Sequence, residues 1–168
     1  MTEGGFAVSR IAAHVPNVQY AALPWRRVEG AIEILLITTR NTRSWIVPKG
    51  WPLDGRTPSE CAAHEALEEA GVLGDVAPEA LGSFHYNKRR KSGEILSCKV
   101  HVFAMEVVHQ RRSWAEKAAR DICWCSLEEA LARVTEPSLR RLIAKFGKIS
   151  GRWLNRRVPD RDAAATTS

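Results

Sequence analysis

Apolar residues form short runs along this chain, and clusters of Gly, Pro, Asn, Asp and Ser separate them. Runs of this kind that are rich in β-branched and aromatic residues predict β-strands. We expect strands at residues 17–27, 31–39, 45–47, 80–86, 96–107 and 121–126. The first two are joined by a turn that contains Gly30, and the fourth and fifth by the basic segment NKRRKSGE, so two hairpins are expected.

A helix is predicted over residues 58–70, because both of its ends carry sequence signals. Thr57 and Glu60 have the spacing of a capping box. Pro58 falls at the first helical position, and Gly71 stands where a left-handed C-cap is favoured. Apolar residues between these ends recur at the spacing of one helix face: Ala63, Ala66, Leu67 and Ala70. We expect this face to pack on a sheet, with the glutamates of the helix opposite it.

Two more helices are predicted near the C-terminus, from the segments SLEEALARV and SLRRLIAKFG. The second segment has its own apolar spacing at Leu139, Leu142, Ile143 and Phe146. Strands, an inserted helix, further strands and then helices predict the α/β class. We expect an α/β/α sandwich with helices on both faces of a mixed β-sheet.

The length of 168 residues is typical of one domain with a sizeable core. We expect a single domain over residues 1–149, with its core at residues 17–147. Residues 150–168 mix basic residues with Pro, Ala and Thr without periodicity, which predicts a flexible basic tail.

The net charge of +6 favours a polyanionic partner, although part of this charge belongs to the tail. The cysteines, Cys61, Cys98, Cys123 and Cys125, lack the spacing of zinc sites and stand among apolar or small residues, which predicts reduced, buried thiols. No apolar stretch is as long as a membrane helix needs, and the N-terminal segment lacks a secretory signal. We therefore expect a cytoplasmic protein without a membrane partner.

Glu65, Glu68 and Glu69 lie three and four residues apart on the predicted helix, which makes them neighbours on its surface. Neighbouring carboxylates repel one another unless a cation lies between them, and carboxylate oxygens are ligands that Mg²⁺ prefers. The simpler interpretation is a solvated helix face. The preceding segment SWIVPKGWPLDG, residues 44–55, favours a metal site, because a short strand leads there into a loop rich in Gly and Pro.

The spacing from Gly50 onward resembles the Nudix box, which reads Gly, five residues, Glu, seven residues, Arg-Glu, an aliphatic residue, any residue, Glu-Glu, any residue, Gly and an aliphatic residue. The positions in register are Gly50, Glu65, Glu68, Glu69, Gly71 and Val72. The resemblance implies hydrolysis of a nucleoside diphosphate linked to another moiety, or of a related pyrophosphate, with Mg²⁺ or Mn²⁺ as the cofactor.

The same resemblance assigns roles to the residues of the box. Glu68 and Glu69 bind the metal, and Glu65 binds it or acts as the general base. The backbone carbonyl of Lys49 or Gly50 adds a ligand. Which glutamate acts as the base varies within the family, so this assignment stays open.

Two positions depart from the pattern, because Arg56 replaces a glutamate and His64 replaces an arginine. In the usual box the arginine pairs with the catalytic glutamate and orients it. His64 is shorter and is charged only when protonated, so this support is either lost or moved elsewhere. Arg56 either contacts a substrate phosphate or holds its charge in solvent, and the second interpretation is slightly favoured.

A longer segment, ILLITTRNTRSWIVPKG, resembles the corresponding part of diphosphoinositol polyphosphate and diadenosine polyphosphate phosphohydrolases. Their substrates are dense in phosphate. Basic residues expected to bind such phosphates are Arg26, Arg27, Arg40, Lys49, Lys88, Arg89, Arg90 and Lys91. The basic hairpin tip fits a solvated loop equally well. Trp51 is a candidate stacking surface, because its loop is expected to be exposed.

The favoured hypothesis is a metal-dependent pyrophosphohydrolase that acts on a small phosphate-rich substrate, either a dinucleoside polyphosphate or an inositol pyrophosphate. A second hypothesis is a non-catalytic module that binds polyphosphates, which the departures at Arg56 and His64 permit. A third is an RNA-end pyrophosphohydrolase, in line with the basic charge. Nucleic acid is the less favoured partner, because no basic groove rich in aromatic residues can be traced in the sequence. The oligomeric state stays open.

Overall fold

The computed structural model describes residues 17–154, which form eight strands in one sheet and three helices. The strands are β1 (Asn17–Val28), β2 (Ala31–Thr38), β3 (Trp45–Ile46), β4 (Lys49–Gly50), β5 (Val72–Val76), β6 (Gly82–Arg89), β7 (Ile95–Gln110) and β8 (Ile122–Ser126). The helices are α1 (Pro58–Ala70), α2 (Leu127–Arg133) and α3 (Pro137–Leu154).

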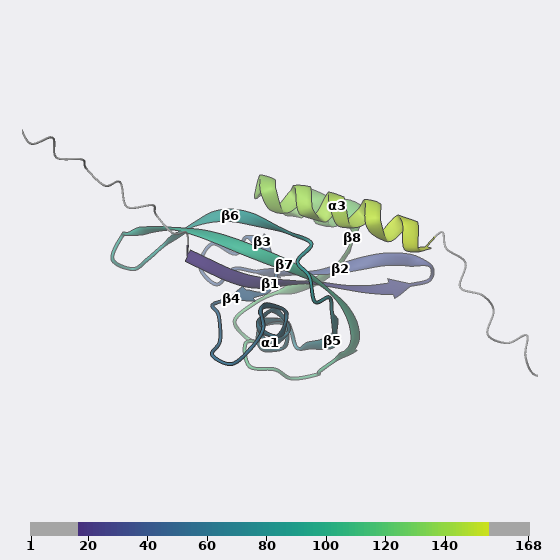
Figure 1. Cartoon of the computed structure of the whole chain (residues 1–168), viewed down its shortest axis with the longest axis horizontal. Coiled ribbons are helices and arrows are strands. Elements are labelled where there is room, and N and C mark those ends of the chain that lie inside the picture. Colours follow the sequence, from purple (N-terminus) through teal and green to yellow (C-terminus); the bar gives the residue numbers. More distant parts are fainter. Residues whose placement is uncertain (1–16, 155–168) are drawn as a thin grey trace, which may run out of the picture.

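The sheet is mixed, as expected, because β1 and β7 run parallel while the other pairs of strands are antiparallel. Its main path is β3-β2-β1-β7-β5, and β4, β6 and β8 pair with β1, β7 and β2. Helix α1 covers one face and α3 the other (Figure 1). Alternate residues of β1 point to opposite faces of the sheet. Leu23 packs in the hydrophobic cluster that includes α3, and Ala22 packs in the cluster that includes α1. The predicted α/β/α sandwich is therefore confirmed.

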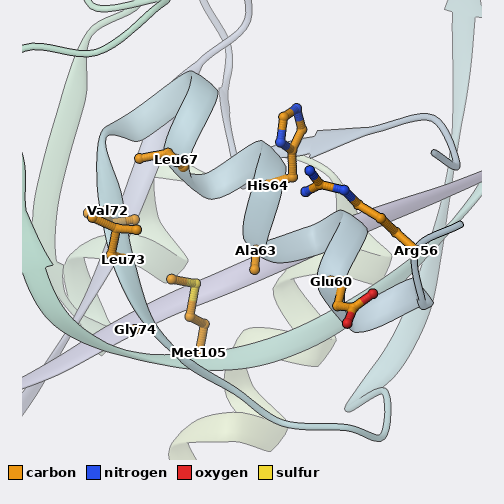
Figure 2. Close-up of a pocket in the computed structure, with 9 residues that line it drawn as sticks. All are labelled: Arg56, Glu60, Ala63, His64, Leu67, Val72, Leu73, Gly74 and Met105. Atoms are coloured by element: carbon orange, nitrogen blue, oxygen red, sulfur yellow. The ribbon is translucent and has the colours of Figure 1, made fainter. Parts of the chain in front are cut away.

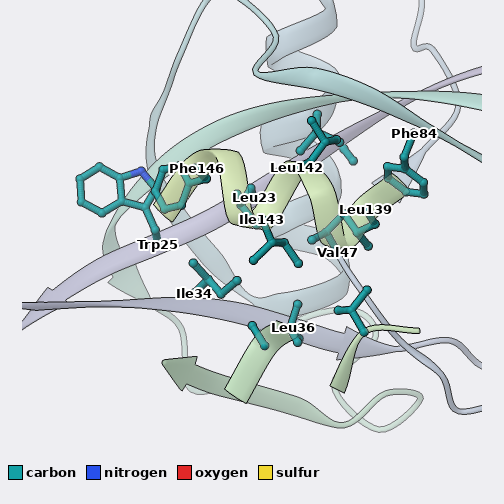
Figure 3. Packing of buried hydrophobic residues seen from close by; sticks show 14 of the residues in the cluster. Leu23, Trp25, Ile34, Leu36, Val47, Phe84, Leu139, Leu142, Ile143 and Phe146 are labelled. Atoms are coloured by element: carbon teal, nitrogen blue, oxygen red, sulfur yellow. The ribbon is translucent and has the colours of Figure 1, made fainter. Parts of the chain in front are cut away.

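The larger core lies under α3, where the predicted apolar spacing is confirmed. Leu139, Ile143 and Phe146 are fully buried in one cluster with Leu23 and Phe84 of the sheet (Figure 3). Burying each side chain of this size contributes roughly 1.5–3 kcal/mol of hydrophobic stabilisation. This layer holds the long strands β1 and β7 in place, and the opposite face of the sheet is left for α1.

Helix α1 begins and ends where the sequence predicted. Thr57 and Glu60 form the capping box, and Gly71 has the left-handed C-cap conformation with φ at 68°. The predicted packing face was partly wrong, however. The buried residues of α1 are Cys61, Ala62, Ala66, Glu69 and Ala70, whereas Ala63 and Leu67 are half-buried. Small residues occupy so many positions of α1 that their spacing alone did not define one face.

Both predicted hairpins are confirmed, β1–β2 and β6–β7. The second is longer than predicted, because β6 continues through the basic segment to Arg89 and β7 starts at Ile95. Two strands were missed. The two-residue strand β4 is too short to leave a pattern, and β5 carries Gly74 at a bulge, where a Cβ atom would lie 1.9 Å from the Glu106 carbonyl oxygen.

Helix α3 continues to Leu154, so the predicted boundary between domain and tail at residues 149 and 150 falls inside a helix. Ser150, the first residue of the predicted tail, is 1% exposed. Residues 1–16 of the predicted domain and residues 155–168 of the tail lie outside the described residues. The four cysteines are free thiols, and three of them are buried. Within residues 17–154, no helix has the length and apolar character needed to cross a membrane.

Candidate metal and phosphate site

The backbone of β4 lies directly against the glutamates of α1. Pairing with Tyr20 and Ala21 of β1 holds this short strand on the sheet. The Lys49 N–H donates to Glu69 Oε2 at 3.2 Å. A Cβ atom on Gly50 would lie 2.1 Å from Glu65 Oε1, so only glycine leaves room for that carboxylate. The structure thus brings Lys49 and Gly50 together with two of the three predicted glutamates.

Glu69 is a buried carboxylate with a cationic partner that the sequence did not indicate. Arg120 donates from Nη2 to Glu69 Oε1 at 3.0 Å, and the two side chains are 12% and 7% exposed. Burial raises the pKa of Glu69 to about 7, although the charge of Arg120 opposes this shift. Burial also raises the pKa of Glu65, against the charge of His64. Both carboxylates therefore sit where additional positive charge would favour their ionised form.

The assignment of Glu65, Glu68 and Glu69 as metal ligands stays a prediction. Within the described part of the chain, no three His, Cys, Asp or Glu side chains are grouped closely enough to hold a metal ion. Arg120 and the Lys49 N–H each donate to one oxygen of Glu69.

The donor atoms nevertheless fit a divalent cation that prefers oxygen ligands. A carboxylate accepts about four hydrogen bonds or metal contacts, so each Glu69 oxygen keeps a free lone pair. No donor among residues 17–154 forms a hydrogen bond with the side chain of Glu65 or Glu68. Glu65 also lies in the space that a side chain at Gly50 would fill. We therefore regard Glu65, Glu68, Glu69 and the backbone of β4 as the candidate metal ligands.

A cavity of about 600 Å³ adjoins these residues, and all the charged residues that line it are basic. The basic residues that line it are Arg40, Lys49, Lys88, Arg89, Arg90, Lys91 and Arg120. The Lys49 ammonium donates to the Tyr86 hydroxyl at 3.0 Å, and burial lowers the pKa of Lys49 to about 8. These basic residues form a positive wall along which several phosphate groups could bind.

A second hollow of about 570 Å³ shares the basic hairpin with the first cavity. Trp51 lines this second hollow and is 40% exposed, so the expectation that its loop is exposed is confirmed. The Lys88 ammonium lies 5.3 Å from the centre of the Trp51 ring. A flat aromatic surface therefore lies next to the basic residues of the hairpin.

Arg26 and Arg27 lie elsewhere, contrary to their predicted place in the positive wall. Arg26 forms an ion pair with Glu33 at 2.7 Å and lies 4.0 Å from the centre of the Trp124 ring. Neither arginine is among the residues that line the two basic cavities. Arg26 is five residues further along β1 than Ala21, a distance of roughly 16 Å on an extended strand.

The two departures from the sequence pattern, Arg56 and His64, also lie away from the basic cavities. They line a separate hollow of about 510 Å³ beside α1, together with Leu67, Val72 and Met105 (Figure 2). Arg56 is exposed, which agrees with the interpretation as a loop arginine with its charge in solvent. His64 is thus not placed to hold Glu69, which is five residues and roughly 140° further around the helix.

Arg120 and Glu116 are the residues of this site that sequence reasoning missed. They come from the segment between β7 and β8, which has no motif and no periodicity. Glu116 forms ion pairs with both Arg40 and Arg120. The basic residues in this segment were the only available signal, and they resemble those of many exposed loops.

Comparison with known proteins adds independent information. The family model described as NUDIX domain matches residues 18–146. "Nudix hydrolase 12, mitochondrial" of Arabidopsis thaliana is 29% identical over 121 residues, which cover 70% of this chain and 60% of that protein. "Diphosphoinositol polyphosphate phosphohydrolase 3-alpha" of Mus musculus is 32% identical over 108 residues, which cover 62% of each protein. The chain thus spans less than two thirds of the length of these curated relatives.

The fold has solved counterparts as well. The structure titled "Crystal Structure of a C. elegans Ap4A Hydrolase Binary Complex" matches with a TM-score of 0.61 at 21% identity, covering 80% of this chain and 97% of that one. At this identity the likeness concerns the fold alone.

Proposed function

Because the chain belongs to the NUDIX domain family, we propose that it is a metal-dependent pyrophosphohydrolase that cleaves a phosphoanhydride bond in a phosphate-rich substrate. The observation that carries this proposal is the position of the 600 Å³ basic cavity, which shares Lys49 and Arg120 with the surroundings of Glu69. Basic residues that can bind several phosphates therefore lie next to carboxylates that can bind a metal ion.

The proposed substrates are dinucleoside polyphosphates or inositol pyrophosphates. The basic wall supports a substrate with more phosphates than a simple diphosphate, because it extends over Arg40 and the whole segment from Lys88 to Lys91. The name of the mouse relative points to diphosphoinositol polyphosphates. Trp51 supports a nucleotide, because an exposed ring next to the wall offers a stacking surface for a base.

In this proposal, different residues of the site bind the substrate and transfer the proton. Arg40 holds phosphate oxygens of the substrate, and Lys49 also neutralises the charge that develops on the leaving phosphate. Arg120 and the Lys49 N–H hold both oxygens of Glu69, so we assign Glu69 to metal binding rather than to proton transfer. Glu65 or Glu68 is then the group that takes the proton of the attacking water.

A divalent metal ion, Mg²⁺ or Mn²⁺, is held in this proposal by Glu65, Glu68 and Glu69 and by a carbonyl of Lys49 or Gly50. When bound, it polarises phosphoryl oxygens and lowers the pKa of a bound water. A cytoplasmic location stays a prediction from the sequence.

A hydrolysis screen tests the proposal. The purified chain is incubated with Mg²⁺ or Mn²⁺ and with diadenosine polyphosphates, diphosphoinositol polyphosphates and triphosphate-ended RNA. We expect release of mononucleotides or of inorganic phosphate from one of the first two classes. The double variant Glu68→Gln, Glu69→Gln is expected to abolish turnover, whereas the exposed Glu79→Gln serves as a control that keeps it.

Each outcome of the screen has a distinct meaning. Turnover by the double variant at the wild-type rate would remove the glutamates from the mechanism. Tight binding of a polyphosphate without hydrolysis would show the non-catalytic module instead. Selective release of pyrophosphate from RNA would identify an RNA-end enzyme and refute the proposed substrate class.

A further inference from the structure

The segment of residues 111–121, between β7 and β8, is fastened to the end of α1 that carries Glu68 and Glu69 (Figure 1). The Arg111 N–H donates to the Gly71 carbonyl at 2.8 Å, and the Glu116 N–H donates to the Glu68 carbonyl at 3.0 Å. The Trp114 ring occupies the space beside Gly71, where a Cβ atom would lie 2.3 Å from it. These contacts hold the segment against the last turn of α1.

Arg120 comes from that segment, and its guanidinium is held from two sides. Nη2 donates to Glu69 Oε1 at 3.0 Å, and Nη1 donates to the Thr38 carbonyl at 3.0 Å. Nε lies 3.7 Å from the Glu116 carboxylate. A planar, rigid donor group fixed at these points also fixes the plane of the carboxylate that it binds.

His64, which stands where the family pattern has an arginine, lies on another side of α1 and lines the hollow with Arg56 (Figure 2). The carboxylate that most needs support is Glu69, since it is buried on the packing face of α1. Among residues 17–154, Arg120 is the side chain that forms an ion pair with Glu69.

We propose that Arg120 is the positioning residue of the site, and that it holds the Glu69 carboxylate from the loop between β7 and β8. Arg120 holds Glu69 Oε1 while the Lys49 N–H holds Oε2, so the remaining lone pairs point in fixed directions. This inference rests on the proposed function for its catalytic readout, although its metal readout does not need turnover.

An alternative role for Arg120 is direct contact with substrate phosphate, since Arg120 also lines the basic cavity. The contacts argue for the positioning role, because both terminal nitrogens already donate to protein oxygens. Arg40 provides the contrast. It lines the same cavity and pairs with the same Glu116, but its side chain is 59% exposed and it forms no bond with Glu69.

Binding of Mn²⁺ alone distinguishes positioning from a simple charge effect. Deleting a cation near the carboxylates would, by charge alone, tighten Mn²⁺ binding. Loss of positioning predicts the opposite sign, so Arg120→Met is expected to weaken Mn²⁺ binding by about 10–100-fold, as for other supports of metal ligands. Arg40→Met, the matched control, is expected to leave Mn²⁺ binding unchanged or tighter. Arg120→Lys keeps one charged donor and is expected to be intermediate.

Kinetics with a substrate identified in the screen provide the second readout. Arg120→Met is expected to lower kcat by about 100-fold with little change in KM, because a carboxylate misplaced by about 1 Å affects the reacting geometry. Arg40→Met is expected to raise KM. If Arg120→Met does not fold, Arg120→Lys and Arg120→Gln replace it in the comparison with Arg40→Met, because each retains a hydrogen-bond donor at this position.

Two results would overturn the proposal: Mn²⁺ binding that is unchanged or tighter in the Arg120 variants, or a raised KM with normal kcat. The first would make Arg120 dispensable to the metal site or a competitor of the metal, and the second would make it a substrate ligand. A wild-type chain that binds Mn²⁺ but hydrolyses nothing refutes the proposed function alone, and the Mn²⁺ comparison still decides the role of Arg120. A wild-type chain that binds neither Mn²⁺ nor Mg²⁺ refutes both.

Discussion

Replacing Gly50 with alanine is expected to separate catalysis from stability. The new Cβ atom would lie 2.1 Å from Glu65 Oε1, 2.3 Å from Cδ and 2.7 Å from Oε2. To reach an ordinary contact of 3.4 Å, the nearest oxygen must move by about 1.3 Å. The obstacle is the far end of a flexible side chain, so the carboxylate can move away while the backbone stays in place.

The expected magnitudes follow from this geometry. A displacement of about 1 Å in a reacting group can cost on the order of 100-fold in rate, so kcat/KM of Gly50→Ala should fall by about that factor. Stability should change little, since Gly50 does not have a positive φ and an alanine fits its backbone conformation. Steady-state hydrolysis and thermal unfolding of the same preparation measure the two effects.

Gly55 offers a matched control with the opposite expectation. Its φ of +73° is unfavourable for alanine, but nothing lies within 4 Å of the added Cβ atom. Gly55→Ala should therefore lose roughly 1–2 kcal/mol of stability and keep its kcat/KM. Wild-type kcat/KM in Gly50→Ala would refute the reasoning, because it would show that the place of Glu65 against β4 does not matter to the reaction.

Three further predictions concern other parts of the molecule. The pKa of Glu69 is raised from 4.5 to about 7, so metal-free stability should fall as pH rises through this window, by roughly 3 kcal/mol in total; denaturant titrations should show a smaller slope in Glu69→Gln than in wild type, because burial also raises the pKa of Glu65. Phe146→Ala should cost about 3–5 kcal/mol of unfolding free energy, because Phe146 is fully buried, and a loss below 1 kcal/mol would contradict the packing described. Lys88→Ala should raise KM and Arg26→Ala should not, because Lys88 lines the basic cavities and Arg26 does not. Equal effects of the two variants on KM would argue against this placement.

The ends of α1 show how far local sequence reaches. Thr57 and Glu60 bond each other's backbone within one turn, and Gly71 adopts a conformation that other residues avoid. Such signals act over three or four residues, so they can be recognised in the chain without its fold. The β1–β2 hairpin was predictable for the same reason.

The packing of α1 shows where prediction from sequence stopped. Spacing identified the three glutamates, yet it placed all of them opposite the sheet, whereas Glu69 is buried against it. Burial of a carboxylate is tolerated here because Arg120, 51 residues away in the sequence, lies within hydrogen-bond distance. No periodic pattern records a partner of that kind.

The basic residues show the same limit of prediction from sequence. Sequence indicated an excess of positive charge and a basic hairpin, but Arg26 is on the far part of β1 while Lys88 lies beside Lys49 in the same cavity. The sequence by itself predicted most of the elements, the caps of α1 and the kinds of chemical groups available, because these depend on neighbours along the backbone. The tertiary structure alone decided which charges meet, because ion pairing acts through space between segments that only the packing of α1 and α3 on the sheet brings together.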